Sequence, residues 1–185
     1  MNSQKIPMSS NQSRASADIL SKYRIVLGFF IVALVLSGIT AFPLQRELDA
    51  VCSVRGIEQL RPQDAHDGLD WWLLTVRDGL KDTDDKYPWL AYGTDWLAFA
   101  HIVIAIFFIG PFVHPTRNVW VLQAGLIGCV LVVLLALVCG PIRHIPLGWR
   151  LIDCSFGAIG AIPLLYCLRA VKTLNAMSAG SGDSD

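Results

Sequence analysis

Charged residues are scarce in this chain: Asp, Glu, Lys and Arg make up 16% of its 185 residues, against about 25% in a typical soluble domain. Apolar residues make up 54%, and the long apolar runs lack the polar stripe that soluble helices carry on one face. The chain also lacks a basic patch with interleaved aromatic residues, which argues against nucleic acid as a partner. These shortages favour an integral membrane protein with room for one domain.

The motifs of several enzyme classes are also missing. The chain has no C-x-x-C pair, no phosphate-binding loop, no nucleophile elbow and no metalloprotease motif. His101 is the only histidine inside an apolar run, so a haem with two histidine ligands is not expected. No metal site is predicted, and the sequence leaves any cofactor unknown.

Four apolar runs are each close to the ~20 residues that cross a hydrocarbon core at about 1.5 Å per residue. The predicted fold is therefore an all-α integral membrane protein, a bundle of four transmembrane helices. One membrane domain, residues 23–172, lies between a polar, disordered tail and a second polar tail, residues 1–22 and 173–185. Within this domain the predicted spans are residues 25–43, 95–113, 119–139 and 149–169.

Basic residues near the ends of the spans indicate an orientation. Lys22 and Arg24 precede the first span directly, and Arg169 and Lys172 follow the fourth. Because basic residues close to span ends favour the cytoplasm, both termini are predicted to be cytoplasmic. The expected location is the inner membrane of a bacterium, with the large loop, residues 44–93, on the periplasmic or extracellular side.

The large loop carries ten acidic and six basic residues, and its middle part has helical periodicity. The pattern predicts a short amphipathic helix over about 67–82. Its apolar stripe consists of Leu69, Trp72, Leu73, Val76 and Leu80. Such a helix either lies on the bilayer surface or covers its own bundle, and its low Lys and Arg content favours the second arrangement.

Ionisable residues gather where the second and fourth spans begin and in the stiff turn before the fourth. Each has a simple structural role open to it, such as helix capping for Asp95 or a local ion pair between Arg150 and Asp153. Together they suggest a ligand site, because ionisable groups within spans are costly and usually have a task. The candidate ligand-binding cluster is Asp95, His101, Arg143, His144, Arg150 and Asp153.

The function expected from this cluster is binding of a lipid-like or quinone-like anionic ligand in an outward-facing polar pocket. No catalytic residue is predicted, and whether the protein is an enzyme stays open. One alternative is a non-catalytic accessory or assembly subunit with a membrane-protein partner. A second is a membrane thiol oxidoreductase that uses Cys139 and Cys154, which lie near the outer ends of their spans.

Overall fold

The computed structural model describes residues 10–180, and this part of the chain is helical, without a strand. Four stretches are long and apolar enough to cross a membrane: Asn11–Ala41, Pro88–Val113, Val119–Ile142 and Leu147–Ala179. The expected all-α character and the four apolar helices are thereby confirmed. The chain has the character of a multi-pass membrane protein.

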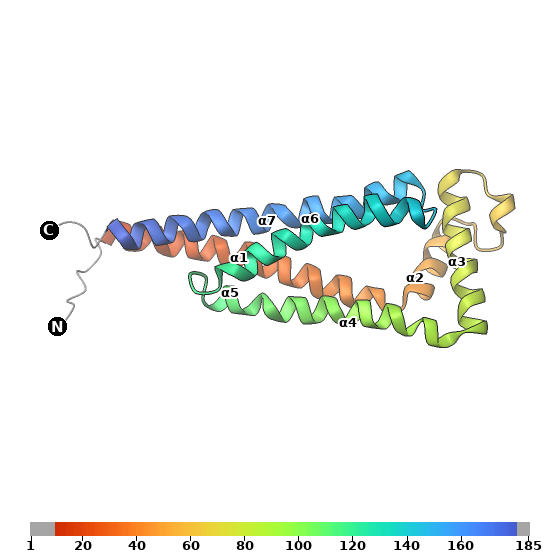
Figure 1. Cartoon of the computed structure of the whole chain (residues 1–185), viewed down its shortest axis with the longest axis horizontal. Coiled ribbons are helices and arrows are strands. Elements are labelled where there is room, and N and C mark those ends of the chain that lie inside the picture. The colour runs from red at the N-terminus through yellow and green to blue at the C-terminus, as the bar shows by residue number, and fades with distance from the viewer. Residues whose placement is uncertain (1–9, 181–185) are drawn as a thin grey trace. The chain divides into compact units, whose positions relative to one another are not determined.

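The helices follow one another along the chain, and the longest connection is that between α2 and α3 (Figure 1). The α-helices are α1 (Ser10–Ala41), α2 (Leu44–Val54), α3 (Gly68–Lys86), α4 (Tyr92–Phe107), α5 (Ile109–Val113), α6 (Val119–Ile142) and α7 (Leu147–Gly180). Two 3₁₀ turns, η1 (Pro62–Asp64) and η2 (Pro88–Leu90), flank α3. Helices α1 and α7 extend into the polar tails, whose remaining residues, 1–9 and 181–185, lie outside the described residues.

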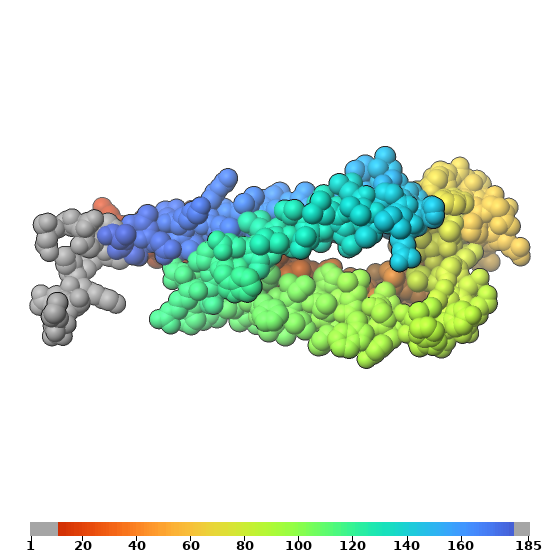
Figure 2. All heavy atoms as spheres, viewed as in Figure 1, coloured from red at the N-terminus to blue at the C-terminus, as the bar shows by residue number. Residues whose placement is uncertain are grey.

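The described chain forms two compact units, residues 10–32 with 106–180, and residues 33–105. In the first unit, α6 and α7 lie side by side, and the space-filling view shows their side chains in contact (Figures 1 and 2). The backbone of Gly157 on α7 lies against the carbonyl oxygen of Cys129 on α6. A β-carbon at Gly125 would lie 2.7 Å from the ring of Phe108. Small residues thus allow close helix contact, as the sequence suggests.

Tyr23 of α1 is fully buried in the same unit, and its hydroxyl donates a 2.9 Å hydrogen bond to the carbonyl oxygen of Pro111. Phe30 adds an edge-on contact with Phe108, with the ring centroids 5.0 Å apart. Pro111 also accounts for the break between α4 and α5, because a proline cannot donate the backbone hydrogen bond that continues a helix. The hydroxyl of Tyr23 therefore joins α1 to the segment beside this break.

In the second unit, α2 and α3 pack against each other to form a helical hairpin (Figure 1). Cys52, Ile57, Leu73 and Leu74 are buried in it. Asp67 caps α3 by accepting a 2.7 Å hydrogen bond from the backbone N–H of Asp70. The large loop between the first two apolar helices is thus a folded element with its own small core.

Burial along α3 follows the packing on α2 rather than the predicted apolar stripe. Leu73 is buried, but Leu69 of the stripe is exposed. Leu74 and Asp70, which lie off the stripe, are buried. Asp70 tolerates this burial because it is paired with Arg55, which follows the last residue of α2.

Candidate functional site

A groove of about 510 Å³ lies in the second unit, where the end of α1 and the start of α4 meet the hairpin. It is lined by the residues that follow α1, by the last turns of α3, and by the residues around the start of α4. These are Phe42, Pro43, Leu44, Gln45, Arg46, Leu80, Thr83, Asp84, Leu90, Ala91 and Thr94. The volume falls in the range of about 300–1,000 Å³ that holds small ligands.

The groove is lined by both apolar and charged side chains. Phe42, Leu44, Leu80 and Leu90 give it apolar walls, and Arg46 is its only basic residue. Its acidic residue is Asp84, on the α3 side, and the polar residues Gln45, Thr83 and Thr94 complete it. A groove with an apolar surface and a few charged groups suits an amphiphilic ligand.

The groove is placed at the end of two candidate membrane spans. Its first five lining residues, 42–46, come directly after the span Asn11–Ala41. Leu90, Ala91 and Thr94 belong to the first two turns of the span Pro88–Val113. The groove therefore lies where the apolar length of both helices ends, which is where a membrane's headgroup region is expected.

Exposed aromatic side chains lie near the start of the span Pro88–Val113, beside the groove. Tyr87 and Trp89 contact each other edge-on, with ring centroids 6.3 Å apart, and Tyr92 and Trp96 do so at 6.0 Å. Trp and Tyr are enriched at membrane–water interfaces, because their rings are apolar and their N–H and O–H groups are polar. The aromatic residues thus agree with the placement of the groove at the membrane boundary.

Two residues of the predicted cluster, Asp95 and His101, lie on α4 in this unit. Asp95 is half-buried and directly follows Thr94 of the groove lining. The Nδ1 atom of His101 lies 2.8 Å from the carbonyl oxygen of Leu97. As that oxygen can only accept, Nδ1 is the donor in this contact, and the tautomer with this proton has Nε2 as its acceptor.

The environment of His101 is set by Gly38 of α1. A β-carbon at Gly38 would lie 3.1 Å from Cβ of His101 and 2.8 Å from the carbonyl oxygen of Ala98. Ala98 and Ala105, which flank His101 on its face of α4, are buried. This face of α4 therefore packs on α1, and His101 lies at its edge, half-buried.

The other four predicted residues, Arg143, His144, Arg150 and Asp153, lie in the first unit around the turn between α6 and α7. Arg143 and His144 are exposed, and His144 has a left-handed backbone with φ of 58°. Asp153 is half-buried, and within residues 10–180 it forms no ion pair with Arg150. The grouping of all six residues into one cluster remains a prediction.

Arg150 has the most unusual environment of these four. Its side-chain carbons pass directly over Gly140, which has no side chain to block them. Its Nε atom is buried, and no hydrogen-bond partner for it exists among the described residues.

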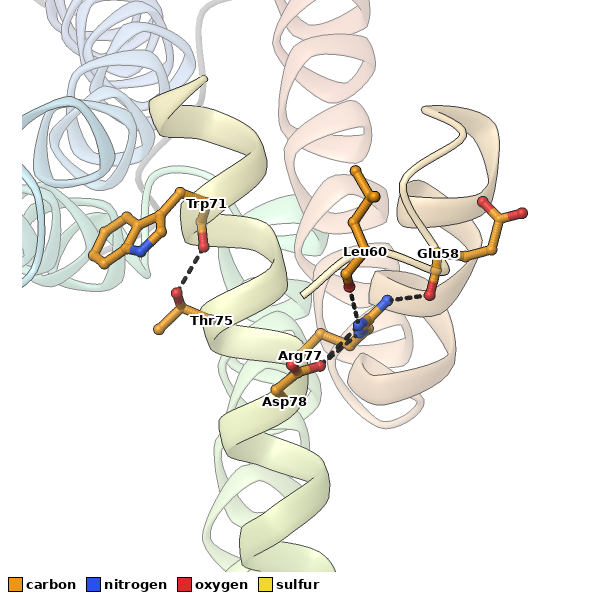
Figure 3. Close-up of polar contacts among 6 residues, drawn as sticks. All are labelled: Glu58, Leu60, Trp71, Thr75, Arg77 and Asp78. Atoms are coloured by element: carbon orange, nitrogen blue, oxygen red, sulfur yellow. Dashed lines mark hydrogen bonds and ion pairs between the residues drawn. The ribbon is translucent and has the colours of Figure 1, made fainter. Parts of the chain in front are cut away.

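The hairpin beside the groove is held by two arginines. Arg55 donates a 2.6 Å hydrogen bond to Asp70 and lies 3.5 Å from Asp67, and the bond to Asp70 raises the pKa of Arg55. Arg77 donates to the carbonyl oxygens of Glu58 at 3.0 Å and Leu60 at 3.3 Å (Figure 3). The two arginines tie the segment between α2 and α3 to the first half of α3.

Arg77 also bonds the carboxylate of its neighbour Asp78, at 2.8 Å and 3.0 Å (Figure 3). Burial lowers the pKa of Arg77, but the hydrogen bonds and the charge of Asp78 outweigh this effect and raise it. Because this raised pKa lies far above neutrality, the Arg77 side chain is charged at every physiological pH.

The cysteines are unpaired in the part of the chain that the structure describes. Cys52 and Cys167 are buried, Cys139 is exposed, and all five cysteines of the chain are free thiols. Within residues 10–180, no three His, Cys, Asp or Glu side chains gather in a way that would hold a metal ion.

Comparison with known proteins adds no identity. No family model, no curated protein and no solved structure matches this chain. Function therefore rests on the chemistry of the site.

Sequence reasoning missed the groove. Its residues come from the connections between α1 and α2 and between α3 and α4, which carry no motif. The available signal was the sequence Phe42-Pro43, where the first apolar run stops and Arg46 follows within one turn.

Proposed function

We propose that this protein binds a membrane amphiphile, a lipid-like or quinone-like molecule with an anionic group, in the groove of the second unit. The observation that carries the proposal is the groove itself, with apolar walls and Arg46 at the level where two candidate spans end. A ligand from the bilayer enters such a groove with its apolar part towards Phe42 and Leu90. Its anionic group lies beside Arg46.

The hairpin covers the groove in this proposal. Leu80, the last residue of the predicted apolar stripe, is part of the groove lining. The amphipathic helix predicted over about 67–82 overlaps α3 from its first residue to all but its last turn, and in this proposal α3 covers the ends of α1 and α4. Arg55 and Arg77 fix α3 in this position by holding it to α2 and to residues 58–60.

The predicted cluster has two functions in this account. On α4, Asp95 adjoins the groove lining, and Nε2 of His101 offers an acceptor deeper along the same helix. In the turn between α6 and α7, Arg143 and Arg150 offer cationic contacts to headgroups of the surrounding bilayer. The groove of the second unit is the primary site.

The proposal includes a bacterial inner membrane location with both termini in the cytoplasm. Alkaline phosphatase fused after Lys86 is then active, and the same enzyme fused after Lys172 is inactive. The opposite pattern would place the groove on the cytoplasmic side and would contradict this orientation.

The binding proposal is tested by native mass spectrometry of the protein extracted gently from its own membrane. We expect one bound lipid or quinone, released by the groove-filling variant Ala91→Trp and kept by the control Ala50→Trp. Both positions are exposed, but only Ala91 lines the groove. Recovery of a stoichiometric complex with other chains and no bound amphiphile would favour the accessory-subunit alternative and overturn the proposal.

A further inference from the structure

The groove presents one cation and one anion to its occupant. Arg46 lies on the α2 wall and Asp84 on the α3 wall. We propose that the occupant is a zwitterionic glycerophospholipid with a primary ammonium headgroup, its phosphate beside Arg46 and its ammonium beside Asp84. This inference rests on the proposed function, because it names the class of amphiphile that the same groove takes.

The two charges line one groove without neutralising each other. In the same unit, Arg55 and Asp70 approach to 2.6 Å, and Arg77 and Asp78 to 2.8 Å. Within residues 33–105, which the structure describes completely, Arg46 and Asp84 form no ion pair with each other or with any other group. Both side chains are exposed, so each charge is accessible to a ligand that carries the opposite charge.

Neighbouring charged residues do not share this space. Glu47 and Asp49 on α2, and Lys81, Asp82 and Asp85 on α3, are absent from the groove lining. The groove thus has a balanced charge of one of each sign. An anionic lipid without an ammonium group would place its net charge close to Asp84, which is unfavourable at short range.

Hydrogen-bonding groups in the groove lining also differ between the region around Arg46 and the rest of the groove. On the first wall, the Gln45 amide and the Arg46 guanidinium supply N–H donors, which suit phosphate oxygens. Thr83 on α3 and Thr94 on α4 differ from these donors, because their hydroxyls each donate at 2.7 Å to a nearby backbone carbonyl oxygen, of Gly79 and Ala91 respectively.

Those two hydroxyls have used their single proton, so towards the groove they offer lone pairs only. Together with the Asp84 carboxylate they form a set of acceptors. A primary ammonium supplies three N–H donors to such a set, whereas a quaternary choline ammonium supplies none. These acceptors therefore distinguish between two lipids that carry the same formal charges.

The apolar lining fits the remainder of the molecule. Phe42, Leu44, Leu80 and Leu90 are available to the glycerol backbone and the first carbons of the acyl chains. The groove lies beside the ends of two candidate spans. The acyl chains can continue into the bilayer without a tunnel in the protein.

The test is a competition experiment on the full-length protein in detergent micelles, measured by native mass spectrometry. Phosphatidylethanolamine, phosphatidylcholine and phosphatidylglycerol with identical acyl chains are added together in equal amounts. We expect phosphatidylethanolamine to be preferred over each of the others by roughly tenfold, the ratio that one charge-assisted hydrogen bond provides.

Two variants test the contributions of the two charges separately. Asp84→Asn should remove most of the preference over phosphatidylglycerol, and Arg46→Gln should weaken binding of all three lipids. Asp82→Asn is the matched control on the same helix, since this residue is exposed and does not line the groove. Each preference is a ratio within one sample, so a partial loss of folded protein does not change it.

The outcomes are distinct. Equal binding of the three lipids, or a preference for phosphatidylglycerol that Asp84→Asn leaves unchanged, would overturn the headgroup inference while the amphiphile site stands. Failure of all three lipids to bind, with a quinone bound instead, would likewise overturn it. Absence of any bound amphiphile would defeat the proposed function itself.

Discussion

The guanidinium of Arg55 and the carboxylate of Asp70 form a 2.6 Å ion pair that joins the end of α2 to the first turn of α3. The two partners differ in exposure, because 7% of the Asp70 side chain and 36% of the Arg55 side chain are accessible. The pair is therefore asymmetric: water can reach the arginine far more readily than the carboxylate.

This asymmetry predicts unequal effects of removing either partner. Arg55→Ala leaves a buried carboxylate without its partner and should lower the thermal unfolding midpoint more than Asp70→Ala, which leaves a cation that water can solvate. The midpoint is read from tryptophan fluorescence in detergent. The double variant should be less unstable than Arg55→Ala alone, and the opposite order would show that Asp70 is solvated.

The two carbonyl contacts of Arg77 predict a local change when this residue is replaced by lysine. A lysine keeps the charge but lacks the planar fork that reaches Glu58 and Leu60 together. Losing this contact should favour local opening by about 1–2 kcal/mol. Amide hydrogen exchange should then become roughly tenfold faster in residues 57–61. The control Arg61→Lys alters an exposed arginine and should leave these rates unchanged.

The contact between Gly157 of α7 and the Cys129 carbonyl oxygen predicts that this helix pair does not tolerate a methyl group there. Gly157→Ala should destabilise the protein by about 1–3 kcal/mol, because the methyl meets backbone that cannot rotate away. Gly128→Ala on α6 is the control, since a β-carbon at Gly128 meets nothing within 4 Å. Equal unfolding midpoints of the two variants would mean that α6 and α7 are further apart than described.

The hydroxyl of Tyr23 predicts a smaller effect. Tyr23→Phe removes only the hydrogen bond to the Pro111 carbonyl oxygen and should cost about 0.5–1.5 kcal/mol in unfolding free energy. Tyr166→Phe, on an exposed position of α7, should change the midpoint little. A Tyr23→Phe variant as stable as the wild type would contradict a direct α1–α5 hydrogen bond.

The helical architecture could be predicted from the sequence, because the length of an apolar run is a local property of the chain. Each apolar run is visible without knowledge of its neighbours, and all four runs appear as long helices. Ala98 and Ala105 were also predictable as buried residues, since small side chains at helical spacing favour helix contact. The partner of that face, Gly38, carried no comparable signal.

The groove and the hairpin depend on contacts between segments distant in sequence. Nothing local indicates that Asp70 meets Arg55, so its burial could not be predicted from the pattern along α3. Arg46 and Asp84 are likewise ordinary charged loop residues in the sequence, and only the fold brings them to one groove. The predicted cluster was chosen by membrane depth, which does not determine neighbours around the bundle.

The most direct test of the central claim is to locate the bound lipid by photocrosslinking. Phosphatidylethanolamine with a photoreactive diazirine near the glycerol end of one acyl chain is irradiated with the purified protein, and the labelled peptides are sequenced. The account predicts labels within residues 42–46 and 80–94, reduced by unlabelled phosphatidylethanolamine and abolished by Ala91→Trp but not by Ala50→Trp. Labels spread along α6 and α7, with the same yield in Ala91→Trp, would contradict a lipid site in the groove.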